Sequence, residues 1–173
     1  TNEKVTTKNC RYAKRLLDNF SITNYFSIFN SQFLIYMGDP RAFLNIARQE
    51  AGYRPVSERI TDYSQVEQTL NTNSRKLQAS RCMDCGVPFC HWACPIGNKQ
   101  PEWQDALYRG KWKEAYEVLS STCDFPEFTG RICPALCEKS CVLKLSCDQP
   151  VTIRENEAAI VEAAFREGYI QVK

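Results

Sequence analysis

The sequence predicts a mostly helical fold, and three observations support this. Apolar residues recur at helical spacing in "KWKEAYEVLSS" and in "IRENEAAIVEAAFRE". Start and stop signals for helices flank these segments. No two strand-like runs are joined by the turn residues of a hairpin. A chain of 173 residues is long enough for one domain, or for one domain with an extension.

The first 36 residues differ in composition from the rest of the chain. They contain neither glycine nor proline, and 18 of the 36 are Asn, Lys, Phe, Ile or Tyr, which A+T-rich codons encode. The first methionine is Met37. A signal peptide or an amphipathic anchor is the alternative, but polar residues interrupt "DNFSITNYFSIFNSQ" too often for a signal core. We expect residues 1–36 to be a non-native upstream extension and residues 37–173 to form the domain.

The next elements are short and loop-rich. After "GYRP", a short amphipathic helix is expected from about Tyr63 to Leu70. The segment "NTNSRKLQASRC" predicts a second helix, which leads directly to Cys82. The following cysteine run must be mainly loop, because glycine and proline interrupt it at Gly86, Pro88, Pro95 and Gly97.

Two helices separated by Gly110 are predicted in "PEWQDALYRGKWKEAYEVLSS". Pro101 suits the first turn of the first helix, where a missing N–H group costs nothing. In the second helix, apolar side chains share one face, and we assign them to the core: Trp112, Ala115, Tyr116 and Leu119.

The last predicted helix begins at "TIREN". Thr152 and Glu155 have the spacing of a capping box, in which each side chain bonds the other residue's backbone N–H group. The helix is expected to end at Gly168, since glycine favours the left-handed conformation found after helix ends.

Composition excludes several classes of function. The net charge is +2, with acids and bases interspersed, so we expect no nucleic-acid partner. Neither G-x-G-x-x-G nor G-x-x-x-x-G-K-[ST] occurs, which argues against a nucleotide site in this chain. No stretch approaches the roughly 20 apolar residues of a membrane span. We therefore expect a cytoplasmic protein that binds no membrane.

The ten cysteines are the outstanding feature. In "RCMDCGVPFCHWACPIGN", four of them follow the pattern C-x2-C-x4-C-x3-C-P: Cys82, Cys85, Cys90 and Cys94. Bacterial ferredoxins use C-x2-C-x2-C-x3-C-P, in which the fourth cysteine binds the other of two iron–sulfur clusters. The spacing therefore predicts that Cys94 is directed towards a second cluster.

A downstream run, "GRICPALCEKSC", supplies Cys133, Cys137 and Cys141. Their spacing of four residues predicts neighbouring turns along one side of a helix, from which thiolates can reach two adjacent clusters. The two runs together hold seven cysteines, whereas two four-iron clusters with four ligands each need one more. The eighth ligand is either a non-cysteine residue or one of Cys123 and Cys147.

Other chemistry was considered for these thiols. Structural zinc sites are usually assembled from paired C-x-x-C knuckles, and only one C-x-x-C is present. Disulfides need an oxidising compartment, for which no secretion signal is credible. The single histidine, His91, could ligate zinc, donate a hydrogen bond near a cluster, or simply be exposed. Cys123 and Cys147 are expected to be ordinary thiols, and Cys10 lies in the expected upstream extension.

Three motifs carry a resemblance to a known family. "RCMDCGVPFCHWACPIGN", "FPEFTGRICPALCEKSCVL" and "PVTIRENEAAI" resemble the N-terminal iron–sulfur domain of the glutamate synthase small (beta) subunit, over about residues 37–170. The domain also resembles the N-terminal part of dihydropyrimidine dehydrogenase. The resemblance implies an α-helical ferredoxin-like fold that holds two [4Fe–4S] clusters.

The resemblance also implies a ligand set. The first cluster would be bound by Cys82, Cys85, Cys90 and Cys141, and the second by Cys94, Cys133 and Cys137. In dihydropyrimidine dehydrogenase, a glutamine seven residues after a proline completes the second cluster. Counted from Pro150, the matching residue is Glu157, a glutamate in place of that glutamine. The alternative for Glu157 is a solvated acid near the start of the last helix, where negative charge is favourable.

The implied function is electron transfer in NADPH-dependent glutamate synthase. In that family, NAD(P)H reduces FAD on the small subunit, and electrons cross the clusters to FMN on the large (alpha) subunit. There the amide nitrogen of glutamine is transferred reductively to 2-oxoglutarate. The family continues beyond Lys173 into its own flavin domain, so we expect this chain to relay electrons without oxidising NADPH. The alternatives are the equivalent domain of another NADPH-linked flavin oxidoreductase and a zinc-organised interaction module.

Overall fold

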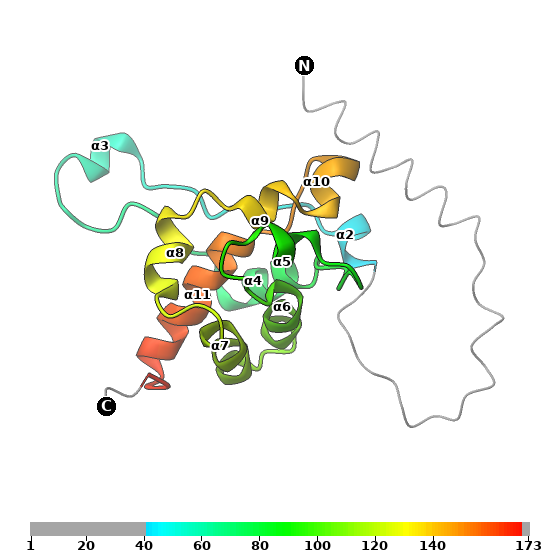
Figure 1. The fold of residues 1–173 in the computed structure, drawn as a ribbon. Helices are drawn as coiled ribbons and strands as arrows, with labels where there is room; N and C mark the ends of the chain where they lie inside the picture. Colours follow the sequence, from blue (N-terminus) through cyan, green and yellow to red (C-terminus); the bar gives the residue numbers. More distant parts are fainter. Residues whose placement is uncertain (1–40, 171–173) are drawn as a thin grey trace, which may run out of the picture.

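The computed structural model describes residues 41–170, and this part of the chain is helical (Figure 1). Its only β-type pairing is an isolated antiparallel bridge between Tyr53 and Glu67. The helices are α2 (Ala42–Asn45), α3 (Val56–Arg59), α4 (Thr72–Ala79), α5 (Phe89–Ala93), α6 (Gln100–Tyr108), α7 (Trp112–Ser120), α8 (Pro126–Ile132), α9 (Leu136–Lys139), α10 (Val142–Cys147) and α11 (Ile153–Arg166). The predicted helical fold class is confirmed.

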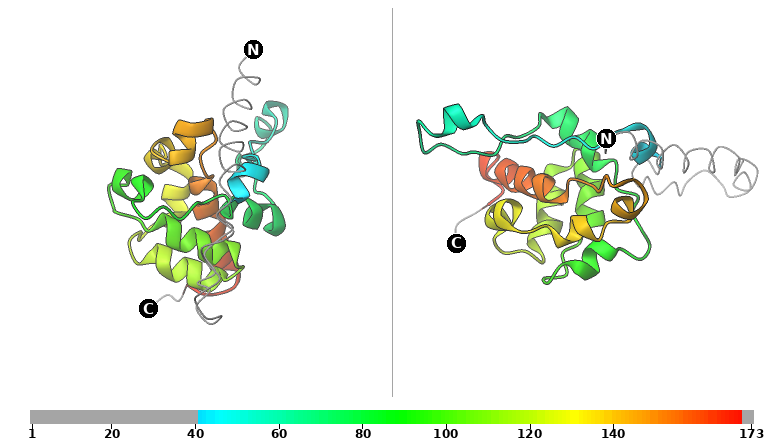
Figure 2. Two further views of the ribbon diagram at one scale, coloured as in Figure 1. Left: turned by 90° about the vertical axis from the view of Figure 1, so that its right-hand side faces the viewer. Right: turned by 90° about the horizontal axis from the view of Figure 1, so that it is seen from above.

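The longest helix, α11, organises the fold. It packs against α8 and α7, and it also touches α4, α6 and α9. A second pair, α6 and α7, lies beside it, while the short helices α5 and α9 contact each other at the cysteine-bearing end (Figures 1 and 2). Within residues 41–170, no helix is long and apolar enough to cross a membrane.

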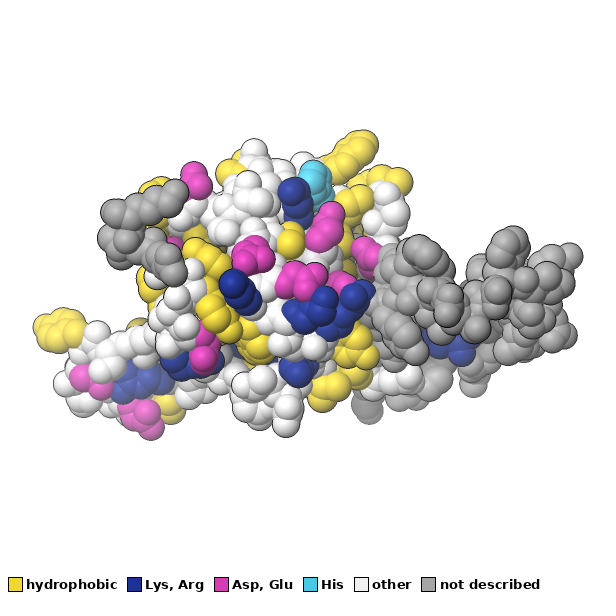
Figure 3. Space-filling model, turned by 90° about the horizontal axis from the view of Figure 1, so that it is seen from below, with side chains coloured by type: hydrophobic (Ala, Val, Ile, Leu, Met, Phe, Trp, Pro, Cys, Tyr) yellow, Lys and Arg dark blue, Asp and Glu magenta, His cyan; other side chains and the backbone are white. Residues whose placement is uncertain are grey.

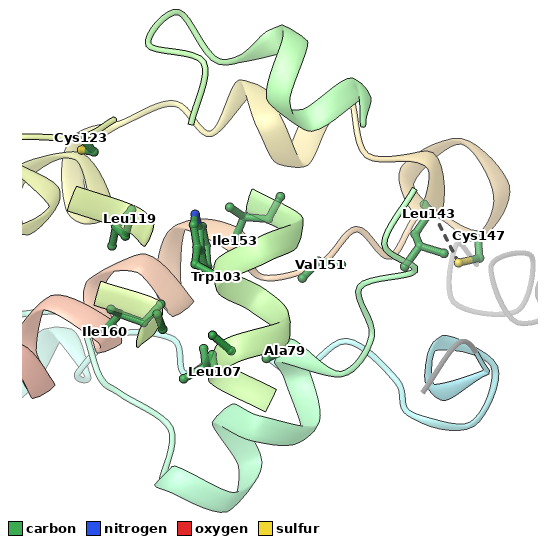
Figure 4. Packing of buried hydrophobic residues seen from close by; sticks show 12 residues of the cluster. Ala79, Trp103, Leu107, Leu119, Cys123, Leu143, Cys147, Val151, Ile153 and Ile160 are labelled. Atoms are coloured by element: carbon green, nitrogen blue, oxygen red, sulfur yellow. Dashed lines mark hydrogen bonds between the residues drawn. The ribbon is translucent and has the colours of Figure 1, made fainter. Parts of the chain in front are cut away.

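The core is centred on the indole ring of Trp103. Figure 4 shows Leu107, Leu119, Ile153 and Ile160 around it, contributed by α6, α7 and α11. The indole N–H group donates a hydrogen bond to Asn98 Oδ1 at 3.1 Å, so the ring is buried without an unpaired polar atom. Of the side chains predicted for the core on α7, Ala115 and Leu119 are buried, while Trp112 and Tyr116 pack against its edge.

The helices on either side of Gly110 form as predicted. Pro101 lies in the first turn of α6, and Gly110 has a φ of +76°, which turns the chain sharply before α7. The predicted helix in "NTNSRKLQASRC" is also present as α4, and the side chain of Asn71 caps it by accepting from Ser74 N–H. Helix α11 is followed, as predicted, by a glycine with positive φ, Gly168.

The helix predicted for residues 63–70 is wrong. Residues 52–68, which we call the arm, project from the body as an extended loop that carries α3 near its tip (Figures 1 and 2). The two sides of the arm are joined by Arg54 N–H to Val66 O at 2.9 Å and Gln68 N–H to Gly52 O at 3.0 Å. An isolated helix of this length is only marginally stable in water, so these backbone bonds prevail.

The capping box predicted at the start of α11 is also wrong in part. Thr152 is the N-cap residue, but its side chain makes no capping hydrogen bond. Glu155 instead accepts from the backbone N–H group of Ala51 and forms an ion pair with Arg75 at 3.2 Å. Partners from a distant segment of the chain therefore replace the local bond.

Charged side chains are mixed on the surface. On the face drawn in Figure 3, Lys and Arg side chains lie next to Asp and Glu side chains. This arrangement agrees with the interspersed charges in the sequence. Several oppositely charged side chains form ion pairs, including Arg131 with Glu162 at 2.6 Å and Arg48 with Glu138 at 2.7 Å.

Helices α8 and α11 approach each other most closely at Gly130. A Cβ atom added at Gly130 would lie 2.8 Å from the backbone N of Ala158 and 2.9 Å from its Cα atom. We expect Gly130→Ala to force the two helices apart and lower the free energy of unfolding by about 1–3 kcal/mol, as overpacking does. Urea denaturation would measure this. Gly86→Ala is the matched control, because its Cβ would meet nothing within 4 Å, and equal stability of the two variants would contradict the expectation.

Candidate metal centre

Four cysteines from two distant stretches of the chain line one small cavity of about 30 Å³. Cys82 and Cys85 belong to the loop after α4, Cys90 lies on α5, and Cys141 is the N-cap residue of α10. Apolar side chains complete the wall: Met83, Phe89, Leu143, Val151 and Ile153. The fold thus brings together the four residues that the sequence assigned to the first cluster.

The loop that carries the first two cysteines is shaped by its own residues. Asp84 has a φ of +48°, a left-handed conformation that Asp tolerates better than most residues, and this turns the C-x-x-C segment back on itself. Ser140 donates a hydrogen bond to Phe89 O at 3.1 Å, which ties the segment before Cys141 to α5.

Arg81 anchors the base of this loop. It is fully buried, and its guanidinium group donates to three backbone carbonyls: Ile46 at 2.9 Å, Pro150 at 3.0 Å and Gln149 at 2.6 Å. Such charge-assisted bonds are stronger than neutral ones. Arg81 therefore fixes Cys82, the next residue, against the segment that leads into α11. Sequence reasoning gave Arg81 no role, because its partners are backbone groups remote in sequence.

The electrostatic environment of the first four thiols favours a positively charged ligand. The pKa values of Cys82 and Cys90 are raised to about 12, chiefly by burial. The charges of Cys90 and Cys141 contribute for Cys82, and the charge of Cys141 contributes for Cys90. Burial followed by the charge of Cys141 also raises the pKa of Cys85. The raised pKa values keep Cys82, Cys85 and Cys90 protonated on their own, whereas bound metal ions deprotonate coordinating thiols outright. The donor set therefore fits a metal centre with thiolate ligands.

A second group forms where α5, α8, α9 and α11 meet. Cys94 and Cys133 are the C-cap residues of α5 and α8, Cys137 lies on α9, and Glu157 lies on α11. Burial raises the pKa of Cys137, and the charges of Glu138, Glu157 and Cys133 add to this effect. Three of the four residues assigned to the second cluster are therefore electrostatically coupled.

The Cys123 thiol is influenced by charges of two residues assigned to the second cluster, Glu157 and Cys94. Burial raises the pKa of the Cys123 thiol, and the charges of Glu157 and Cys94 contribute. The Cys123 sulfur lies 3.3 Å from Thr129 Oγ1, and the Thr129 hydroxyl donates in turn to Glu157 Oε1. The sequence contained no spacing signal for Cys123, since it lies ten residues before the downstream cysteine run.

Glu157 is not a solvated acid, which corrects one of the two readings of this residue. Its side chain belongs to the buried part of α11 with 8% of its surface exposed. Burial raises its pKa to about 7, and the hydrogen bond from Thr129 opposes part of this rise. A buried carboxylate needs a partner such as a metal ion or a hydrogen-bond donor.

The single helix predicted through the downstream cysteines is wrong. Helix α8 ends before Cys133, and α9 and α10 are separate turns with Cys137 and Cys141 at different points on them. Pro134 disfavours helical geometry at Cys133, whose ψ is 137°. Ala135 then adopts a left-handed φ of +53°. These breaks, rather than a helical face, direct Cys141 to the first group and Cys133 with Cys137 to the second.

Glu138 holds the turn that carries Cys137. Its carboxylate accepts from Arg48 at 2.7 Å and from the backbone N–H group of Arg154 at 2.9 Å. The turn is therefore attached both to the segment after α2 and to the start of α11. Sequence reasoning did not identify this acid, because the arginine that pairs with it is 90 residues away.

The remaining residues named in the sequence analysis are Cys147, His91 and Cys10. Cys147 is buried and bonds to Leu143 O at 3.3 Å on its own helix, as expected of an ordinary thiol (Figure 4). His91 is half-buried on α5, and its imidazole faces Gly97. Cys10 and the rest of the predicted extension lie outside the described residues. Within residues 41–170, no three Cys, His, Asp or Glu side chains are grouped closely enough to hold a single metal ion.

The helical fold and the two cysteine groups define an iron–sulfur domain, and comparison with known proteins identifies its family. Residues 59–169 match the family described as dihydropyrimidine dehydrogenase domain II, 4Fe-4S cluster. The chain belongs to this family of α-helical ferredoxin-like domains, whose role is iron–sulfur electron transfer. This membership favours iron over the alternative of a zinc-organised module.

Individual relatives share most of the chain. The small chain of NADPH-dependent glutamate synthase from Mycobacterium tuberculosis is 48% identical over 136 residues, which are 78% of this chain and 28% of the relative. The small chain from Bacillus subtilis is 44% identical over 144 residues, or 78% of this chain and 29% of that one. The NADH-dependent glutamate synthase of Schizosaccharomyces pombe is 42% identical over 132 residues, which are 75% of this chain and 6% of the relative. The chain thus spans less than a third of these relatives.

Proposed function

We propose that this chain is the electron-relay domain of the small subunit of glutamate synthase (NADPH) and carries two [4Fe–4S] clusters. One observation carries the proposal. Cysteines that are about 50 residues apart in the sequence line a single cavity, as a shared ligand set requires. The similarity to glutamate synthase small chains supports the choice of enzyme.

In this proposal, each cluster takes ligands from both cysteine runs. The first is held by Cys82, Cys85, Cys90 and Cys141, and the second by Cys94, Cys133, Cys137 and Glu157. When bound, the clusters accept and release single electrons, which connects two-electron hydride chemistry to one-electron steps. The chain's own residues exclude water with apolar walls and hold the ligands in place, through Arg81 for the first group and Glu138 for the second.

The remaining parts of the enzyme are proposed from the same relationship. NAD(P)H and FAD would bind in the subunit's own C-terminal flavin region, and FMN on the large (alpha) subunit would receive the electrons. The products would be glutamate from glutamine and 2-oxoglutarate, made in the cytoplasm. Residues 37–173 would form the domain, and residues 1–36 a non-native extension, which intact-mass analysis of the protein from its native host would test.

A second candidate keeps the redox role but changes the enzyme. The matched family is described by dihydropyrimidine dehydrogenase, so the domain could equally serve another NADPH-linked flavin oxidoreductase. The full gene and its neighbours distinguish the two. A neighbouring large subunit with glutaminase and FMN domains supports glutamate synthase, and its absence from the genome supports the second candidate.

The proposal is tested by anaerobic reconstitution of this chain with iron and sulfide. We expect about eight irons and eight sulfides per chain, as two four-iron clusters require, together with a brown colour and broad visible absorbance. About four irons per chain would contradict the two-cluster assignment. A colourless protein with stoichiometric zinc would instead support the zinc-organised module.

A further inference from the structure

A chain of hydrogen bonds ends at the proposed carboxylate ligand of the second cluster. Cys123 Sγ lies 3.3 Å from Thr129 Oγ1, and the Thr129 hydroxyl donates to Glu157 Oε1. The three residues come from the loop after α7, from α8 and from α11, so tertiary packing alone brings them together. Neither the cysteine spacing nor the ligand pattern of the family assigns a role to Thr129 or Cys123.

Which atom donates and which accepts in each of these hydrogen bonds follows from counting protons. A threonine hydroxyl has one proton to donate and lone pairs to accept with. Glu157 Oε1 and Phe125 O, which is 3.3 Å away, compete for the Thr129 proton. The carboxylate oxygen is the stronger acceptor, because it is charged. Thr129 therefore donates to Glu157, and the Cys123 S–H group is left as the donor to Thr129.

The bond to Glu157 is unusual for a threonine in a helix. Helical threonines commonly bond the carbonyl four residues earlier, which for Thr129 is Phe125. Here the distance from the hydroxyl to Phe125 O is 3.3 Å, and the same hydroxyl also bonds Glu157 on α11. The contact also lies beside Gly130, where α8 and α11 approach most closely. The helix crossing therefore holds the Thr129 hydroxyl against Glu157.

We infer that Thr129 is a positioning residue for the second cluster, holding the Glu157 carboxylate in place through Oε1, with Cys123 orienting the Thr129 hydroxyl. This inference rests on the proposed function, because it needs Glu157 to be a ligand. Carboxylates that bind metals are themselves hydrogen-bonded, and loss of such a partner typically weakens metal binding 10–100-fold. A bonded carboxylate also donates less electron density to iron, which raises the reduction potential.

The test compares Thr129→Val with Thr129→Ser in reconstituted chain. Valine keeps the shape and removes the hydroxyl, whereas serine restores it. For Thr129→Val we expect a fall in the midpoint potential of the second cluster equivalent to about a tenfold change in its reduction equilibrium, or about 59 mV for one electron. The first cluster should keep its potential. Redox titration followed by electron paramagnetic resonance measures both clusters separately.

Two further variants complete the design. Thr129→Ser should restore the wild-type potential, and Cys123→Ala should lower it less than Thr129→Val, since it removes only the orienting donor. Thr61→Val is the matched control, because the Thr61 hydroxyl bonds Glu58 O on the arm. If Thr129→Val does not fold, Cys123→Ala alone decides the question, and an unchanged second-cluster potential in that variant overturns the inference.

The outcomes separate this inference from the proposed function. A wild-type chain that binds only one cluster refutes the proposed function itself. A wild-type chain with two clusters, whose second potential is the same in Thr129→Val, refutes only the positioning role. A shift in Glu157→Gln without a shift in Thr129→Val would leave Glu157 as a ligand and remove Thr129 from its support.

Discussion

Cys90→Ser is expected to remove the first cluster and about four of the eight irons per chain. Cys90 is the α5 member of the four cysteines that line one cavity. Cys82 and Cys85 come from the loop after α4, and Cys141 is the N-cap residue of α10. A serine hydroxyl is a poor replacement for a thiolate ligand of iron. Because metal binding and folding are coupled in small metal-binding domains, the variant should also unfold at lower denaturant concentration.

Iron and sulfide analysis with electron paramagnetic resonance measures this result. Cys147→Ser is the matched control, because Cys147 is a buried cysteine whose bond runs to Leu143 O on its own helix. The control should retain both clusters. A Cys90→Ser protein that still binds eight irons would contradict the ligand assignment. Loss of iron in Cys147→Ser but not in Cys90→Ser would mean that Cys147, and not Cys90, is a cluster ligand.

Arg81→Met is expected to lower the free energy of unfolding by at least about 2 kcal/mol. The variant leaves the carbonyls of Ile46 and Gln149 without their buried donor, and each unsatisfied buried group costs about 1–3 kcal/mol. The carbonyl of Pro150 keeps a second donor, Arg48 Nη1 at 2.8 Å. For a domain of this size, the loss corresponds to a fall in Tm of more than about 6 °C. Cys82, which follows Arg81, should then bind the first cluster less tightly.

Thermal denaturation and chelator titration measure the two effects. Arg166→Met is the control, because Arg166 is exposed on the last turn of α11 and pairs with Glu167 at 3.0 Å. Exposed ion pairs contribute about 1 kcal/mol or less, so the control should behave like the wild type. If Arg81→Met were as stable as Arg166→Met, the bonds to the three carbonyls would not anchor the loop.

Local signals predicted much of the fold. Gly110 separates two helices, Thr152 occupies an N-cap position, and Gly168 follows the last helix, all where the sequence indicated. These features depend on backbone preferences of a few adjacent residues. The resemblance to a known family implied that the four cysteines of the first group form one set, and they line one cavity.

The errors have a common physical cause. The arm replaced a predicted helix because its two sides bond each other across 16 residues, from Gly52 to Gln68. Glu155 does not form the predicted capping box. Its carboxylate instead bonds Ala51 and Arg75, which are 104 and 80 residues away. In both the arm and Glu155, partners that are distant in the sequence determined the structure. A local sequence pattern does not reveal such partners.

The sequence by itself determined the helical class, because helix signals act locally. Its cysteine spacing predicted iron–sulfur chemistry, and its resemblance to a known family implied the two ligand sets. Only the tertiary structure decided the surroundings of the second group. It buried Glu157, brought Cys123 and Thr129 to its carboxylate, and left Gly130 as the contact between α8 and α11. Burial and hydrogen bonding between helices depend on packing of distant segments, which no short stretch of sequence specifies.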